Sequence, residues 1–148
     1  MFRFIILFVI LSLPLKGEEI LMKCVNKSDN AVDFYKWNNP LVGKTTIFLR
    51  REGEWVRWCN NESHGTDAKT WNYNSKIKLQ DKGARCFTSY SKKYDDGSYR
   101  KGKVESFIDF EVYGREYNKR GTYTNPEGKK ENDNETIRYV CSRYKKDD

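Results

Sequence analysis

The sequence has a single histidine, three prolines and no Cys-x-x-Cys pair. A zinc site needs four closely arranged nitrogen or sulfur ligands, and this composition offers only four irregularly spaced cysteines. Long hydrophobic segments are also missing. The longest apolar run covers residues 4–15 and is too short to cross a hydrocarbon core of about 30 Å comfortably. We therefore expect no metal site, no cofactor and no membrane span in the mature domain.

The apolar run near the amino terminus has the layout of a secretory signal peptide. Arg3 precedes the run, and Lys16, Gly17 and two acidic residues follow it. A short positive region, an apolar stretch and a small residue at its end are typical of such signals. We predict cleavage after Gly17, which leaves residues 18–148 as one secreted or periplasmic domain. An uncleaved membrane anchor is the alternative.

Basic residues outnumber acidic residues by 28 to 21, so the formal net charge is +7. Loss of two cations, Arg3 and Lys16, with the signal lowers this charge from +7 to +5. A positive exported domain favours partners of negative charge, such as an anionic glycan or another envelope component. Nucleic acid is not expected as a partner, because the sequence has no nucleic-acid-binding motif and is predicted to leave the cytoplasm.

The clearest strand signal is the segment Lys103–Tyr113, KVESFIDFEVY. Successive side chains of a strand point to opposite faces, and this segment alternates with a period of two. One face carries Val104, Ser106, Ile108, Phe110 and Val112, and the other carries Glu105, Phe107, Asp109, Glu111 and Tyr113. The pattern predicts a half-buried strand that a bulge at Gly114 interrupts.

Shorter segments with strand-like residues follow one another along the whole mature chain. They cover residues 18–26, 31–37, 44–51, 54–59, 70–79, 84–90, 115–124 and 135–144, and Arg51-Glu52-Gly53 suits a short hairpin loop. The polar segments 60–69 and 125–134 are interpreted as loops, and no amphipathic helix is evident. The sequence predicts an all-β domain, a small antiparallel sandwich or barrel of about eight to nine strands.

The four cysteines fit an oxidising compartment, where an even number in a short exported chain indicates disulfides. Cys24 shares a strand face with Ile20 and Met22, and Cys141 shares one with Ile137 and Tyr139. Both thiols are therefore predicted to point into the core from strands near the two ends of the chain. We predict the pairs Cys24–Cys141 and Cys59–Cys86.

His64 lies beside Ser63 and three residues before Asp67, so a hydrolase site can be considered. Such a site needs its nucleophile, base and acid to converge in space, and no Gly-x-Ser-x-Gly nucleophile elbow is present. We interpret His64 as a loop histidine without a catalytic role.

Three acids, Glu105, Asp109 and Glu111, share one face of the predicted strand 103–113. Neighbouring carboxylates on one strand face lie about 6–7 Å apart, a separation that glycoside hydrolases use. Nothing in the sequence buries one of these acids to raise its pKa. A solvated strand face paired with cations is the favoured interpretation, and we assign no catalytic residue.

Basic residues alternate with aromatic residues in several segments, and aromatic residues make up 15% of the chain. Exposed rings stack on sugars or bases, and arginine and lysine attract anionic groups. Strand propensity and solubility explain the same composition without a ligand. The candidate binding surface comprises Trp37, Trp55, Arg57, Trp58, Arg115 and Tyr117.

These observations predict an exported, non-enzymatic binding domain that recognises an anionic envelope or extracellular macromolecule through basic and aromatic surface residues. The first alternative is a small-ligand carrier with a β-barrel cavity. The second is an envelope hydrolase that uses the carboxylates of strand 103–113.

Overall fold

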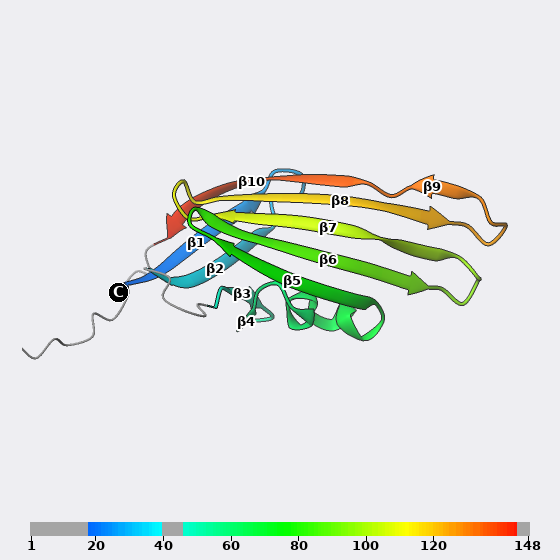
Figure 1. Ribbon diagram of the computed structural model, residues 1–148, viewed down its shortest axis with the longest axis horizontal. Coiled ribbons are helices and arrows are strands. Elements are labelled where there is room, and N and C mark those ends of the chain that lie inside the picture. The colour runs from blue at the N-terminus through cyan, green and yellow to red at the C-terminus, as the bar shows by residue number, and fades with distance from the viewer. Residues whose placement is uncertain (1–17, 40–45, 145–148) are drawn as a thin grey trace, which may run out of the picture.

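The computed structural model describes residues 18–39 and 46–144, so the predicted signal peptide, 1–17, lies outside the described residues. Ten strands form one antiparallel sheet in the order β4-β3-β2-β1-β10-β8-β7-β6-β5, with β9 paired to β8. The sheet curls into a half-barrel (Figure 1). The strands are β1 Glu18–Asn26, β2 Val32–Asn39, β3 Phe48–Arg51, β4 Glu54–Arg57, β5 Asn72–Gln80, β6 Gly83–Lys93, β7 Tyr99–Asp109, β8 Gly114–Thr124, β9 Lys130–Asn132 and β10 Glu135–Tyr144. The all-β prediction is confirmed.

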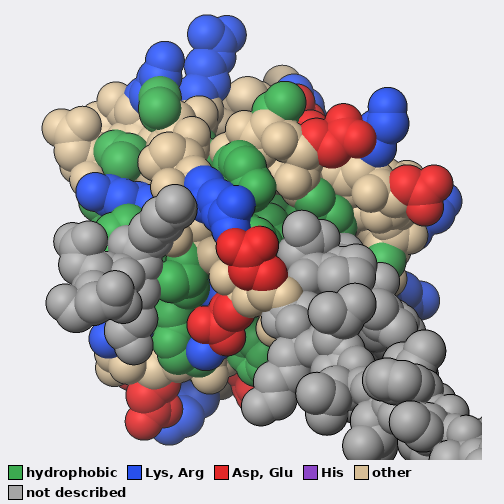
Figure 2. All heavy atoms as spheres, turned by 90° about the vertical axis from the view of Figure 1, so that its left-hand side faces the viewer, with side chains coloured by type: hydrophobic (Ala, Val, Ile, Leu, Met, Phe, Trp, Pro, Cys, Tyr) green, Lys and Arg blue, Asp and Glu red, His purple; other side chains and the backbone are tan. Residues whose placement is uncertain are grey.

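Alternating side chains give the curled sheet an apolar inner face and a polar outer face. The inner face of β1 and β2 meets that of β6 and β7 across the half-barrel, where Met22, Tyr35, Ala84 and Ile108 have no exposed surface. The end of the half-barrel in Figure 2 shows hydrophobic side chains between charged ones. The core therefore lies inside the curl, and Cys24 points into it as predicted.

Both predicted disulfides are present. Cys24 and Cys141 are directly opposite each other on β1 and β10, with their Cα atoms 4.1 Å apart. Cys59 follows β4 and joins Cys86 on β6, with a Cα–Cα distance of 5.5 Å. The first bond locks neighbouring strands, and the second ties the two halves of the curl together. Disulfides of this kind indicate an oxidising, extracellular-type environment.

The segment 60–69, interpreted above as a loop, instead forms a 3₁₀ helix, η1, Asn61–Lys69, so that interpretation was wrong. Asn60 provides its N-cap by accepting a hydrogen bond from the Ser63 backbone N–H. Gly65, with φ of 61°, allows a kink inside η1. Its polar sequence lacks helical periodicity because the helix is short and is held by its cap and by neighbouring strands.

The segment Lys103–Tyr113 is not one continuous strand, which corrects the prediction. β7 ends at Asp109, and the chain folds back through a four-residue turn so that Asp109 pairs with Gly114. The Asp109 carboxylate accepts hydrogen bonds from the backbone N–H groups of Glu111 and Val112, which stabilises the turn. Gly114 therefore begins β8 rather than forming a bulge, and Val112 is 74% exposed instead of inward-facing.

One tight turn explains why the boundary between β3 and β4 was predictable. β3 and β4 join through Glu52 and Gly53, which both have positive φ, the backbone of a type I′ turn.

Strands β6 and β7 extend further than predicted, into polar segments that continue beyond the half-barrel (Figure 1). β9 is a short strand inside the predicted loop 125–134. Within the described ranges, no helix is long and apolar enough to cross a membrane.

Replacing Cys59 and Cys86 together by alanine is expected to lower the free energy of unfolding by about 3 kcal/mol, because this bond restricts the unfolded chain. Urea unfolding of the purified double variant measures the change. A loss below about 1 kcal/mol would contradict the expectation and would show that packing alone holds the two halves together.

Candidate functional site

A pocket of about 300 Å³ opens on the inner face of the half-barrel. Strand β3, the segment after β4, η1 and strands β5–β8 all contribute to its walls, so it is built from distant parts of the chain. Its lining combines cations with aromatic rings, principally Arg51, Arg115, Lys119, His64, Trp71 and Tyr73. The mixture of charged groups and flat rings makes this pocket the candidate site.

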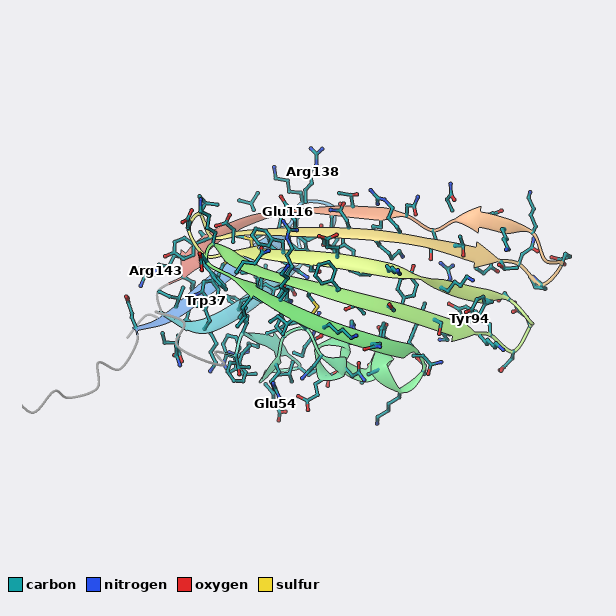
Figure 3. The ribbon with its side chains drawn as sticks, viewed as in Figure 1. Trp37, Glu54, Tyr94, Glu116, Arg138 and Arg143 are labelled. Atoms are coloured by element: carbon teal, nitrogen blue, oxygen red, sulfur yellow. A yellow bond between two sulfur atoms is a disulfide. The ribbon has the colours of Figure 1, made fainter. Side chains whose placement is uncertain are left out.

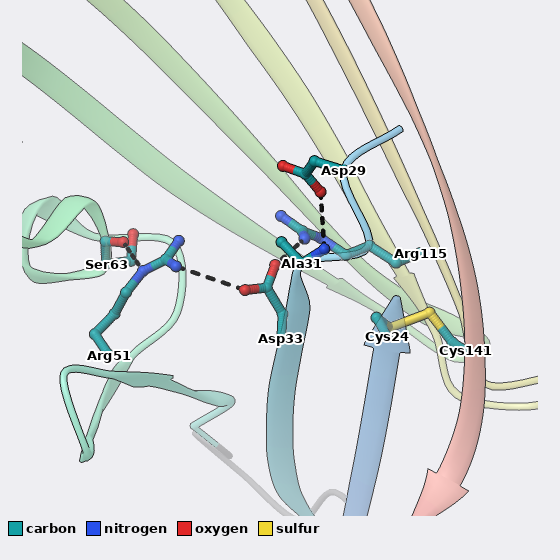
Figure 4. A network of polar contacts seen from close by, with 8 residues as sticks. All are labelled: Cys24, Asp29, Ala31, Asp33, Arg51, Ser63, Arg115 and Cys141. Atoms are coloured by element: carbon teal, nitrogen blue, oxygen red, sulfur yellow. Dashed lines mark hydrogen bonds and ion pairs between the residues drawn. A yellow bond between two sulfur atoms is a disulfide. The ribbon is translucent and has the colours of Figure 1, made fainter. Parts of the chain in front are cut away.

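Two arginines in the pocket share one carboxylate. Asp33 on β2 accepts a hydrogen bond from Arg115 at 2.9 Å and lies 3.6 Å from Arg51 (Figure 4). Arg51 is oriented from the other side, because its Nε donates to the backbone carbonyl of Ser63 in η1 at 3.0 Å. Two positive charges and one negative charge leave the cluster with a net charge of about +1. The pocket is therefore suited to a single anionic group.

Arg115 is the most buried cation of the pocket, with a side chain only 7% exposed. Its guanidinium lies over the rings of Tyr139 and Tyr35, at 4.2 and 5.1 Å from their centroids. Burial acts to lower the pKa of Arg115, but Tyr35, Tyr139 and Asp33 outweigh it and raise the pKa, so the group stays charged. Its Nε has no hydrogen-bond partner among the described residues. A buried donor without a partner is costly, which favours a ligand or a water at this position.

An aromatic wall borders the cations. His64 stacks on Tyr73 with ring centroids 3.7 Å apart, and Tyr73 stacks on Trp71 at 6.1 Å. The ring of Tyr90 meets Trp71 edge-on at 5.8 Å. Flat ligand rings, including the faces of sugars, bind to such surfaces through apolar contact and ring stacking. The wall and the arginines together place surfaces for ring stacking and for pairing with a negative charge in one pocket.

Two glycines position Tyr90 in this wall. Gly102 on β7 and Gly121 on β8 face each other, and the Tyr90 ring from β6 occupies the space above them. A Cβ atom at Gly102 would lie 2.6 Å from the Tyr90 hydroxyl, closer than van der Waals contact permits. Burial raises the pKa of Tyr90, and its buried hydroxyl has no partner among the described residues.

The environment of His64 favours the neutral form of its ring. Burial and the nearby Arg51 both disfavour the imidazolium, so the pKa of His64 lies below its ordinary value. Its Nε2 lies 3.4 Å from the Ser75 hydroxyl, which contacts the Thr88 hydroxyl at 2.8 Å. The histidine thus serves as an uncharged flat surface at the pocket edge.

The structure places half of the candidate binding surface in this pocket. Trp58, Arg115 and Tyr117 line it, and burial raises the pKa of Tyr117 to about 12. Trp37 belongs to the core, where it packs against Phe110 at 5.1 Å (Figure 3).

Trp55 and Arg57 lie on the outer face, because β4 alternates and their partners Arg50 and Phe48 also point outward. Lys36 contacts the Trp55 ring there at 4.5 Å. These residues are therefore separated from Trp58 by the sheet itself.

The other residues considered for catalysis do not assemble as the hydrolase interpretations require. The Ser63 hydroxyl donates to the Asn60 carbonyl and not to His64. Glu105 pairs with Arg85 at 2.9 Å, and Glu111 lies in the turn after β7. Among the described residues, no group of three or more His, Cys, Asp or Glu side chains could hold a metal ion.

Sequence reasoning missed Asp33, Arg51, Trp71 and Tyr73 as parts of a site. Asp33 and Arg115 are 82 residues apart, and only the sheet order brings them together. The inward phase of Asp33, shared with Tyr35 and Trp37 on β2, was a signal, since a charge on a buried face needs a partner.

No protein-family model, curated protein or solved structure matches the chain.

Substituting Gly121 by alanine is expected to destabilise the protein by about 1–3 kcal/mol and to displace Tyr90, because overpacking forces shifts in well-packed regions. The new Cβ would collide with the Tyr90 hydroxyl and lie 2.7 Å from the Lys101 carbonyl oxygen. Gly114→Ala is the matched control, since its nearest neighbour is 3.7 Å away. Equal unfolding midpoints for both variants would contradict this role of Gly121.

Acidification is expected to destabilise the wild-type protein more than His64→Gln. His64 has its ordinary pKa of 6.5 in the unfolded chain, whereas folding lowers this pKa, so the unfolded chain holds the His64 proton more readily than the folded protein does. The unfolded state therefore binds more protons below about pH 6.5, and stability falls as the pH falls. Urea unfolding of both proteins between about pH 7.5 and 5.5 measures the difference. Parallel pH profiles would show that His64 is not responsible.

Proposed function

We propose that this chain is an exported binding protein whose half-barrel pocket holds a small anionic ligand with a ring, such as an acidic sugar or the acidic end of a glycan. The main observation that supports this proposal is that Arg51 and Arg115 share the single carboxylate of Asp33. A partly buried cluster with excess positive charge is stabilised when an anionic group enters it.

The pocket supports a small ligand rather than a flat macromolecular contact. Its volume of about 300 Å³ is at the lower end of ordinary ligand sites, enough for one sugar-sized ring. The stacked rings of Trp71 and Tyr73 provide a flat surface close to the arginines. This proposal joins the anionic chemistry of the binding-domain interpretation to the cavity of the carrier interpretation.

Export is part of the proposal and rests on two independent features. Residues 1–17 have the layout of a signal peptide. The described part of the chain contains no free cysteine, since all four form disulfides, which persist outside the reducing cytoplasm. A secreted or periplasmic location would give the pocket access to envelope and extracellular glycans.

Isothermal titration with glucuronate and glucose tests the ligand chemistry, because the two sugars differ only at C6, where glucuronate has a carboxylate in place of a hydroxymethyl group. We expect glucuronate to bind and glucose to bind at least about tenfold more weakly, since a hydrogen bond to a charged group contributes about 1.5–3 kcal/mol. Comparable binding of both sugars, or binding of neither, would contradict the proposal.

Arg51→Gln is expected to weaken glucuronate binding about tenfold or more for the same reason. Arg50→Gln is the matched control, because the neighbouring residue on β3 faces outward and contacts Trp55 instead. Urea unfolding verifies that both variants remain folded. Equal losses of affinity in the two variants would show that overall charge, and not the pocket, attracts the ligand.

A further inference from the structure

The outer face of strands β5–β8 carries a second polar surface, separated from the pocket by the sheet. The cross-strand register aligns eight side chains in two rows of four. The first row is Asn72, Ser91, Lys101 and Thr122, and the second is Asn74, Ser89, Lys103 and Arg120. The rows line a shallow groove of about 650 Å³. None of the eight side chains is acidic or apolar.

Three cations in these rows lie close together without compensation. Lys103 and Arg120 are directly opposite each other, and like charges in this arrangement destabilise a sheet. Lys101 precedes Lys103 by two residues on β7 and lies about 7 Å from it along the same face. Within residues 18–39 and 46–144, none of the three forms an ion pair with an acidic side chain.

Elsewhere on the same outer face, a cation is paired with an acidic side chain. Arg85 on β6 pairs with Glu105 on β7 at 2.9 Å, so the sheet neutralises that cation with a neighbouring acid. The two rows lack such an acid although they occupy the same strands. An anionic partner would relieve the repulsion between Lys103 and Arg120, so binding such a partner would stabilise this arrangement of charges.

We propose that the two rows bind a linear anionic polysaccharide, independently of the ligand in the pocket. The cations attract its sulfate or carboxylate groups, and the amides and hydroxyls of the remaining residues can exchange hydrogen bonds with its sugar hydroxyls. Single-stranded nucleic acid fits less well, because its binding surfaces present aromatic rings to successive bases. The two rows contain none. Of the three tyrosines that border the groove, Tyr73 and Tyr90 have the opposite strand phase and line the inner pocket, and only Tyr99 shares the outward phase of the rows.

A heparin decasaccharide is the probe, titrated calorimetrically into the full mature protein at two salt concentrations. The test variant combines Lys101→Gln, Lys103→Gln and Arg120→Gln. We expect its affinity to fall about tenfold or more and the dependence of binding on salt to become weaker, because fewer counterions are released.

The matched control combines Lys76→Gln, Lys78→Gln and Lys82→Gln, which removes the same charge from β5 and its following turn. This control variant should bind heparin within about twofold of the wild-type affinity if contacts in the two rows, and not the overall positive charge of the protein, determine binding. Equal losses in both triple variants would overturn the proposal, as would tighter binding of a single-stranded oligonucleotide of similar charge.

Arg51→Gln separates the two sites. It should leave heparin binding unchanged, while the outer-face variant should leave glucuronate binding unchanged. If Arg51→Gln abolishes heparin binding, the polysaccharide enters the pocket and the outer-face proposal fails. Failure of glucuronate to bind would contradict the pocket proposal alone.

Discussion

The ion-pair cluster of Arg51, Asp33 and Arg115 is the constraint on which the inner face of the half-barrel depends. A buried arginine is tolerated only when a carboxylate and good hydrogen bonds accompany it. Asp33 supplies the carboxylate from β2, and Arg115 reaches it from β8 across the curl. Because these strands are not neighbours in the sheet, the contact helps to set how far the sheet closes. The same contact leaves space and positive charge beside it, so the closure of the sheet and the proposed binding site depend on the same ion pairs.

The disulfides and the glycines refine this arrangement. Cys59–Cys86 places the segment after β4 against β6, which brings Trp58 and η1 to the pocket edge. η1 then orients Arg51 through the Ser63 carbonyl. Absence of a Cβ at Gly121 lets Tyr90 complete the aromatic wall. Each feature acts on the position of a pocket group, so the site is a consequence of how the two halves of the sheet are joined.

Local sequence was sufficient for most of the strands and for the disulfides, but not for the site. The bounds of β1 and β10, and the phase of Cys24 and Cys141, follow from alternation, which each segment contains in itself. The turn after Asp109 depends on a side-chain hydrogen bond that competes with the strand pattern, so alternation alone missed it. The pocket requires contacts between residues such as Asp33 and Arg115, and periodicity carries no information about partners that distant in sequence.

The two proposed sites differ in how strongly salt should weaken their attraction for anions, because their cations differ in burial. Arg115 is enclosed, so salt screens its interaction with a ligand only weakly, and shape and ring contacts decide which anion fits. Lys101, Lys103 and Arg120 are exposed, and their attraction decreases steeply as salt increases. The outer rows therefore suit a long, repetitive partner that provides many weak contacts, whereas the pocket suits a single group. A domain with both would hold a polymer on its outer face while the pocket remains free to select a small anionic ligand.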